Sequence, residues 1–266
     1  MEDIDIMKIG FIGMGNMAKA LVAGFLKSGK VTGDEIFAYA PHQDKLNKNA
    51  SELGFTASKS SEELVEMVDI VIMACKPNQI EAVLEKLGDK LNGKALLSIA
   101  AGWNFASFTK ILGDKVRIQC IMPNTPAMVG EGVMLFEKTN SLNDQEREWI
   151  LFLFATLGIV EELPTSLMGI GGAVTGCGPA FMDLIMEGYA DAAVKYGIPR
   201  SVAYKLVSQT MLGSAKLQRM TGEHPGVLKD AVCSPGGTTI RGVDALEHGR
   251  LRAICIDSID AIMNKK

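Results

Sequence analysis

The sequence predicts an α/β protein in which a doubly wound, mostly parallel sheet is followed by an all-helical domain. Short apolar segments alternate with amphipathic segments from Met7 to about Leu163, and this alternation is typical of a parallel sheet covered by helices on both faces. After Leu163-Pro164 the segments of strand length stop and only helical patterns follow. We therefore expect one domain at residues 1–163 and a second domain at residues 164–266.

Six strands are expected, each a short apolar segment bounded by turn residues: 7–12, 35–40, 69–74, 95–99, 116–122 and 132–137. Three helices between or after these strands are expected at 17–28, 61–67 and 144–157. The last of them follows Asn143, with Glu146 three residues further on, which matches the positions of a capping box.

The second domain is expected to contain helices at 181–196, 199–221, 226–232, 239–248 and 250–264. Pro199 suits the first turn of a helix, where its missing N–H costs nothing, and Gly197 and Gly249 are suitable helix ends. Residues 203–217 are apolar on more than one side. A helix of this kind needs more cover than a small domain supplies, so we expect it to be buried in an oligomer.

Composition excludes several classes of protein. Apolar residues make up 47% and charged residues 22%, a globular profile, and the formal charge of −4 leaves no basic groove for nucleic acid. The five cysteines are odd in number and form no C-x-x-C pair, which argues against disulfides and zinc. The acidic start, Met1 to Asp5, is unlike a signal peptide, and no apolar run approaches a membrane span. We expect a soluble, cytoplasmic protein with no metal and no membrane partner.

A glycine motif lies between the first strand and the first helix. Gly13 and Gly15, with Ala18, form G-x-G-x-x-A, in which the first glycine permits a tight turn and the second allows close approach of a pyrophosphate. The N-terminus of the following helix stabilises the anion. Because strand, loop and helix come in the required order, the motif predicts a Rossmann-like dinucleotide site rather than an ordinary turn.

The end of the second strand indicates which dinucleotide is used. Enzymes that select NAD usually carry Asp or Glu there, to bond the ribose hydroxyls. The strand ends at Ala40 without an acid, so nothing repels a 2′-phosphate and NADPH is expected. NADH stays an alternative because Asp44 is close in sequence, and His42 and Lys45 are either near the phosphate or ordinary surface residues.

A second irregular segment interrupts the helical domain. Residues 233–240, Cys-Ser-Pro-Gly-Gly-Thr-Thr-Ile, break one helix and open the next. Such a loop can direct backbone N–H groups and hydroxyls at one point before a helix N-terminus, which makes an anion site without a cation. The alternative is a plain helix–helix connection with Thr238 or Thr239 as N-cap, and the residues alone leave the two readings even.

Three further loops follow the expected strands, at 75–77, 100–102 and 122–126. Doubly wound folds bind ligands at the carboxyl ends of their strands, so these loops are expected to line a shared cleft.

These segments together resemble the pyrroline-5-carboxylate reductase family over nearly the whole chain. The stretches that carry the resemblance are 10–17, 75–77, 98–102, 122–126, 176–181, 222–226, 228–230 and 234–240. The glycine motif is shared with many dehydrogenases, whereas the final loop and the His224-Pro225-Gly226 segment are far more particular. The resemblance implies reduction of 1-pyrroline-5-carboxylate to L-proline with NADPH or NADH. It also implies interlocked dimers, in which the final loop closes a site shared between chains, and rings of five dimers among relatives.

The resemblance also assigns residues to the site. The cofactor is expected to contact Gly13, Met14, Gly15, Asn16, Met17, Ala40, Ser61, Lys76, Pro77, Ala100 and Ala101. As a hypothesis about the mechanism, the backbone N–H groups of Gly236, Gly237 and Thr238 and the Ser234 hydroxyl are expected to hold the substrate carboxylate, and Thr239 to hydrogen-bond the ring nitrogen as the catalytic residue. The substrate can arrive already protonated, so Thr239 need not be the acid. His224 is the alternative acid, although a helix start makes a structural role more plausible.

The chain departs from the family pattern at three positions. Cys177 and Phe181 stand where relatives commonly have Ser and Tyr, and Cys75 stands where Val is frequent. Two other functions stay open. A 3-hydroxyacid dehydrogenase would need a catalytic lysine such as Lys195, and a nucleotide-binding regulator would bind NADPH without turnover.

Overall fold

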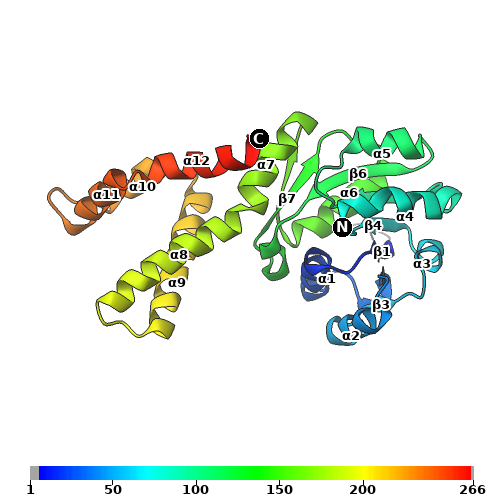
Figure 1. Cartoon of the computed structure of the whole chain (residues 1–266), viewed down its shortest axis with the longest axis horizontal. Coiled ribbons are helices and arrows are strands. Elements are labelled where there is room, and N and C mark those ends of the chain that lie inside the picture. The colour runs from blue at the N-terminus through cyan, green and yellow to red at the C-terminus, as the bar shows by residue number, and fades with distance from the viewer. Residues whose placement is uncertain (1–5, 265–266) are drawn as a thin grey trace. The chain divides into compact units, whose positions relative to one another are not determined.

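The computed structural model describes residues 6–264 of the chain (Figure 1). The acidic segment Met1 to Asp5 and the tail Lys265-Lys266 lie outside the described residues. The chain forms two compact units, Met1–Gly176 and Cys177–Lys266, and each is described by itself.

The first unit is built on one eight-stranded sheet with the order β3-β2-β1-β4-β5-β6-β7-β8. Neighbouring strands are parallel except β6 and β7, which are antiparallel. The strands are β1 (Ile9–Ile12), β2 (Ile36–Tyr39), β3 (Thr56–Ala57), β4 (Ile70–Met73), β5 (Ala95–Ser98), β6 (Arg117–Met122), β7 (Gly132–Glu137) and β8 (Gly158–Leu163). The six expected strands and the mostly parallel, doubly wound architecture are confirmed, whereas β3 and β8 were not predicted.

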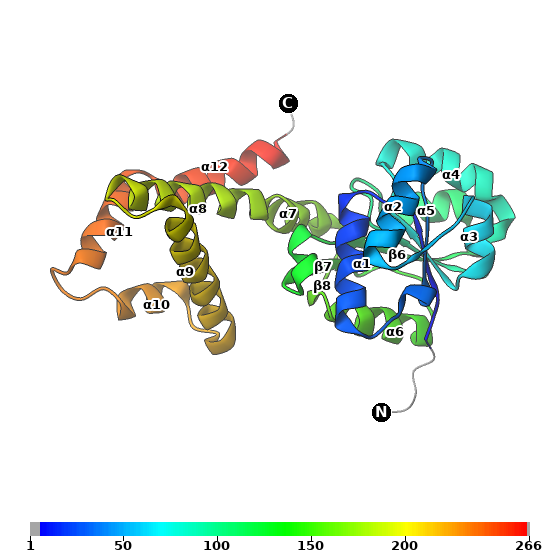
Figure 2. The same ribbon diagram turned by 90° about the horizontal axis from the view of Figure 1, so that it is seen from below.

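Helices cover both faces of this sheet (Figure 2). Side chains of α1 (Asn16–Ser28), α2 (Gln43–Leu53) and α6 (Asp144–Ala155) join one core cluster, and those of α3 (Ser61–Met67), α4 (Ile80–Leu87) and α5 (Phe105–Leu112) join the other. Strand residues alternate between the clusters, as Phe11 faces the first and Ile12 the second. Short 3-10 helices lie at Gly33–Glu35, Pro77–Gln79, Gly88–Leu91 and Thr125–Val129, and α7 (Thr165–Gly176) packs on β6, β7 and β8.

Side chains cap the helices where the sequence places short polar residues. Asn143 accepts a hydrogen bond from the backbone N–H of Glu146, whose carboxylate accepts from the backbone N–H of Asn143, so the expected capping box is present. Ser60 caps α3 and Asn104 caps α5 in the same way, through a side-chain oxygen that accepts from the third helical residue. These caps fix where α3, α5 and α6 begin, and α5 is the helix that follows the loop at 100–102.

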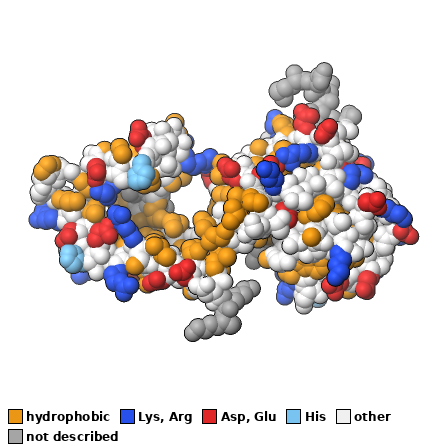
Figure 3. All heavy atoms as spheres, turned by 90° about the horizontal axis from the view of Figure 1, so that it is seen from above, with side chains coloured by type: hydrophobic (Ala, Val, Ile, Leu, Met, Phe, Trp, Pro, Cys, Tyr) orange, Lys and Arg blue, Asp and Glu red, His pale blue; other side chains and the backbone are white. Residues whose placement is uncertain are grey.

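The second unit contains α8 (Gly178–Lys195), α9 (Arg200–Thr221), α10 (Pro225–Ala231), α11 (Thr238–His248) and α12 (Leu251–Met263). The five expected helices are confirmed, while α7 was not predicted. Among the described residues of this unit only Ala190 and Ala203 are buried apolar residues. Leu184, Tyr196 and Met220 are 69%, 84% and 77% exposed, and Figure 3 shows many orange hydrophobic side chains over these helices. The unit therefore lacks an apolar core of its own.

The described helices include one stretch, Thr165–Lys195, that is long enough to cross a membrane and contains an 18-residue window with a mean hydropathy of 1.2. This differs from the expectation, drawn from the sequence, of no apolar run long enough for a membrane span. A single stretch of this kind is weak support for a membrane segment, and the lack of cover over the helical unit gives its apolar side chains another explanation.

Candidate active site

The cleft loops share one edge of the sheet because four strands end level with one another. Ile12 of β1 pairs with Met73 of β4, Met73 pairs with Ser98 of β5, and Ser98 pairs with Cys120 of β6. The order of strands reverses between β1 and β4, so the loops after these two strands diverge on either side of that point. Doubly wound folds bind their ligands in the crevice at such a reversal.

Gly13 makes the turn that leaves β1. Its φ of +102° lies in the left-handed region, and its N–H donates a hydrogen bond to the Tyr39 carbonyl at 2.8 Å. A Cβ at this position would lie 2.7 Å from the backbone of Ala74. Only glycine therefore fits, and its role is to let the loop pass close to the neighbouring strand.

Gly15 serves a different purpose, because a Cβ there would meet no atom within 4 Å. It is the N-cap of α1 and supplies no side-chain cap, so the first-turn N–H groups point toward open space. Asn16 is exposed beside it and Met17 is half-buried, whereas the side chain of Met14 is buried in the core. The uncapped helix and the free space above Gly15 fit the pyrophosphate of a dinucleotide.

The end of β2 lies next to this loop. Ala40 is half-buried, and its carbonyl accepts a hydrogen bond from the Gln43 side chain at 3.0 Å. Ser61 is 2% exposed, and its hydroxyl donates to the Glu62 carboxylate at 2.9 Å. The Lys86 ammonium lies 2.9 Å from the same carboxylate and 3.4 Å from the Ser61 hydroxyl. Lys86 was not singled out from the sequence.

A tryptophan joins the loops that follow β4 and β5. The indole N–H of Trp103 donates to the Pro77 carbonyl at 3.2 Å, and the Trp103 backbone N–H donates to the Ala100 carbonyl at 3.4 Å. Lys76 and Ala101 are exposed at this edge. The structure thus brings the predicted cofactor residues of both loops together, through a side chain that sequence reasoning missed.

The loop after β6 is engaged in packing. Asn124 is buried, its amide donates to the Thr175 carbonyl of α7 at 3.0 Å, and its oxygen accepts from the Val133 N–H at 2.8 Å. With both ends of the side chain bonded internally, Asn124 fixes β6, β7 and α7 to one another. Its side chain therefore serves packing and is not free to bind a ligand.

Glu137 is a second buried polar residue that sequence reasoning missed. Its carboxylate accepts from the Phe105 N–H at 2.7 Å and from the Thr165 hydroxyl at 2.5 Å, so it joins the starts of α5 and α7. Burial, together with this carboxylate, raises the pKa of the neighbouring Cys120 thiol. The sequence feature that could have indicated Glu137 is its position as a charged residue at the end of β7, an otherwise apolar strand.

The irregular loop of the helical unit precedes α11. Gly237 is the N-cap of that helix, so neither Thr238 nor Thr239 is the cap, which corrects the alternative reading. Both threonines are exposed in the first turn, and Ser234 is exposed. Gly236 has φ +68°, and a Cβ at Gly237 would lie 2.4 Å from the Ser234 Oγ. The two glycines permit the turn that places these groups before an uncapped helix.

One detail of the expected carboxylate site differs from prediction. The Gly237 N–H donates to the Ser234 carbonyl at 2.9 Å, so it is engaged within the turn. The backbone groups that remain for an anion are those of Gly236, Thr238 and Thr239, with the Ser234 hydroxyl beside them. Gly237 therefore contributes to the site by having no Cβ, which leaves room for the Ser234 hydroxyl, and its N–H is not available to an anion.

His224 occupies a structural position. It is the N-cap of α10, and its Nδ1 accepts a hydrogen bond from the Gly226 N–H at 3.0 Å. Asp230 forms an ion pair with Lys229, and burial raises the pKa of the Cys75 thiol, as suits a small apolar residue. No group of three or more potential metal ligands occurs among the described residues.

Comparison with known proteins gives two family matches. Residues 165–266 match the model described as pyrroline-5-carboxylate reductase dimerisation, and residues 8–102 match that described as NADP oxidoreductase, coenzyme F420-dependent.

Individual relatives match nearly the whole chain. The pyrroline-5-carboxylate reductase of Escherichia coli K12 is 39% identical over 259 residues, covering 97% of this chain and 96% of that protein. The corresponding protein of Treponema pallidum is 37% identical over 262 residues, covering 97% and 99%. The crystal structure of Plasmodium falciparum pyrroline carboxylate reductase with NADP bound superposes with a TM-score of 0.87 at 32% identity, covering 98% of this chain and 96% of that one.

Proposed function

The chain belongs to the pyrroline-5-carboxylate reductase family, and from this premise we propose that it reduces the cyclic imine 1-pyrroline-5-carboxylate to L-proline with NADPH. Two helix starts without a side-chain cap carry the proposal, and each of them follows a glycine turn. One begins at Gly15 and the other at Gly237. The first suits a dinucleotide pyrophosphate, and the second suits a small carboxylate.

We propose that α1 holds the cofactor through the backbone at Gly13, Gly15, Asn16 and Met17. Ala40 and Ser61 border the adenosine end, while Lys76, Pro77, Ala100 and Ala101 line the opposite loops, which Trp103 holds together. When bound, NADPH supplies the hydride. The protein fixes its position, and no acid at Ala40 opposes a 2′-phosphate.

The substrate needs orientation more than a strong base. A protonated imine is a good hydride acceptor, so a residue that fixes the ring can contribute several kcal/mol, about 7 to 11 in the most favourable cases, to lowering the barrier. The backbone of Gly236 and Thr238 and the Ser234 hydroxyl would hold the carboxylate. The Thr239 hydroxyl would hydrogen-bond the ring nitrogen and set which carbon receives the hydride.

The active protein is proposed to be an oligomer of interlocked dimers. Its size is proposed to lie between one dimer and a ring of five dimers. The exposed apolar side chains of the helical unit support association, because monomeric soluble proteins rarely expose so much contiguous apolar surface. We assign residues 1–163 to cofactor binding and residues 164–266 to dimerisation and substrate binding, in a cytoplasmic protein.

The test is NADPH oxidation, followed by absorbance, with racemic pyrroline-5-carboxylate and with NADH in parallel. Oxidation that yields proline is expected, faster with NADPH. A purified, folded oligomer that oxidises neither cofactor would overturn the proposal. Binding of NADPH without turnover would then favour a regulator, and turnover of a 3-hydroxyacid would favour a dehydrogenase using Lys195.

A further inference from the structure

The adenosine ribose of a dinucleotide lies at the end of the second strand in doubly wound folds, so the charges there decide between NADPH and NADH. Tyr39 is the last residue of β2 and pairs with Ile12, the residue before the glycine loop. Its carbonyl accepts from Gly13, which ties it to that loop. Ala40 follows Tyr39 and has no charged side chain. Any cation that binds a 2′-phosphate here must therefore come from another part of the fold.

One ammonium reaches this position from another helix. The Lys86 Nζ of α4 lies 5.9 Å from the centre of the Tyr39 ring, within the range of a cation–π contact. It is also 3.4 Å from the hydroxyl of Ser61, the residue already assigned to the cofactor. About half of the Lys86 side chain, 51%, is exposed to solvent. The ammonium is therefore held at the end of β2 and is accessible to a ligand.

Glu62 positions that ammonium. Its carboxylate lies 2.9 Å from the Lys86 Nζ and accepts a hydrogen bond from Ser61. The hydrogen bond from Lys86 lowers the pKa of Glu62 to about 2, so the carboxylate is charged at neutral pH. The pair has no net charge as it stands, and a phosphate must compete with Glu62 for the same cation.

We propose that Lys86 is the residue that recognises the 2′-phosphate of NADPH and that Glu62 restrains it, so that the pair sets the ratio of NADPH to NADH binding. The inference rests on the proposed function only in taking the glycine-loop cleft as a dinucleotide site. His42, Asp44 and Lys45, the charged or titratable residues that follow β2 in sequence, are exposed, and within the described residues they form no hydrogen bond or ion pair with Tyr39 or Ser61.

The experiment is isothermal titration of the purified oligomer with adenosine 2′,5′-bisphosphate and with adenosine 5′-monophosphate, which differ in the 2′-phosphate alone. A charge-assisted bond to phosphate is worth about tenfold in affinity. Lys86→Met keeps the apolar stem and should weaken the bisphosphate about tenfold while changing the monophosphate little. Glu62→Gln should shift bisphosphate affinity in the opposite direction, because it releases the ammonium from its competitor.

A matched control is the ion pair of Lys90 and Glu66, four residues after Lys86 and Glu62. Glu66 lies on α3 with Glu62, whereas Lys90 lies in the 3-10 helix Gly88–Leu91 that follows α4. Lys90→Met should leave both affinities unchanged. Equal loss of both ligands in Lys86→Met, or unchanged bisphosphate binding, would overturn the inference. If wild-type protein bound neither ligand, the dinucleotide site itself, and with it the proposed function, would fail instead.

Discussion

Gly13 and Gly15 show how two residues of one type can have different reasons to be glycine. Gly13 is required by the fold, since its φ of +102° and the Ala74 backbone exclude a side chain. Gly15 has φ −80° and open space around its Cα, so the fold does not require it. The sequence motif alone does not distinguish these roles.

Alanine at each position should therefore have different effects. Gly13→Ala places a side chain in a strained region and should lower the free energy of unfolding by about 2 kcal/mol or more. Gly15→Ala should leave the melting temperature unchanged and weaken NADPH binding about tenfold, because the methyl group occupies space intended for the pyrophosphate. Thermal unfolding and cofactor titration of both variants measure the two effects. Equal destabilisation by both would contradict this division.

Thr239 is the second residue whose role can be separated from packing. It is exposed in the first turn of α11, so removing its hydroxyl should not disturb the fold. Thr239→Ala should lower kcat by about 10- to 100-fold, the value of one hydrogen bond to a charged group, with little change in NADPH affinity. Thr239→Ser keeps the hydroxyl and should retain most of the activity. A parallel loss of cofactor affinity in Thr239→Ala would contradict the assignment.

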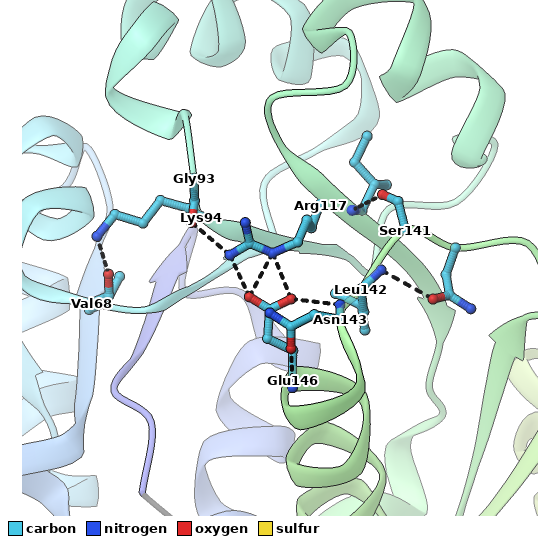
Figure 4. A network of polar contacts seen from close by, with 10 residues as sticks. Val68, Gly93, Lys94, Arg117, Ser141, Leu142, Asn143 and Glu146 are labelled. Atoms are coloured by element: carbon cyan, nitrogen blue, oxygen red, sulfur yellow. Dashed lines mark hydrogen bonds and ion pairs between the residues drawn. The ribbon is translucent and has the colours of Figure 1, made fainter.

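At the scale of elements, an ion pair fastens α6 to the sheet (Figure 4). Arg117 of β6 donates to both carboxylate oxygens of Glu146, at 2.8 and 2.7 Å from Nε, and also to the Gly93 carbonyl at 2.7 Å. The Glu146 side chain is 7% exposed, and this pairing raises the pKa of Arg117. The same carboxylate closes the capping box at Asn143, so one residue serves both the helix start and the strand.

Breaking this pair from one side should be costly. Arg117→Met leaves a buried carboxylate without its cation and should lower the free energy of unfolding by about 3 kcal/mol. Arg147→Met is the control, since Arg147 pairs with Glu162 at a more exposed site and such pairs contribute less than about 1 kcal/mol. Urea unfolding of both variants gives the comparison. If both variants lost a similarly small free energy of unfolding, the buried Glu146 carboxylate would not need Arg117 for its stability.

Elements with strong periodicity or a cap were predictable from sequence, and others were not. The six apolar strands and the Asn143–Glu146 cap carry local signals that packing did not override. β3 has only two residues, and β8 contains Glu161 and Glu162, so neither has the apolar pattern of a buried strand. The apolar, glycine-rich α7 has no distinct polar face, because it packs on the sheet on one side while apolar residues such as Leu167 and Val174 are exposed.

The site was predictable only where its residues are consecutive in sequence. The glycine motif and residues 233–240 each form a local turn before a helix, so the sequence indicated where these turns lie, although residues 233–240 alone left an anion site and a plain helix–helix connection equally open. Lys86, Ser61 and Tyr39 come together only because α3, α4 and β2 meet in the folded sheet, and Trp103 reaches Pro77 across 26 residues. The internal bond of Gly237 likewise depends on a turn geometry that the sequence does not specify.

At the scale of the whole molecule, the helical unit exposes apolar side chains that the proposed association between copies would cover. Leu184 of α8 is 69% exposed in the single chain, so a polar residue there costs the isolated fold nothing, yet it should oppose burial between copies. Leu184→Glu should shift the sedimentation coefficient toward that of a monomer and abolish reductase activity, while adenosine 2′,5′-bisphosphate still binds.

The control is Ile111→Glu, which makes the same kind of change at a 44% exposed position of α5. It should alter neither the sedimentation coefficient nor the reductase activity. If Leu184→Glu remained a fully active oligomer, this part of α8 would lie outside the subunit contact. If it dissociated yet kept full turnover, the helical unit would need no partner for catalysis, and its exposed apolar surface would require another explanation.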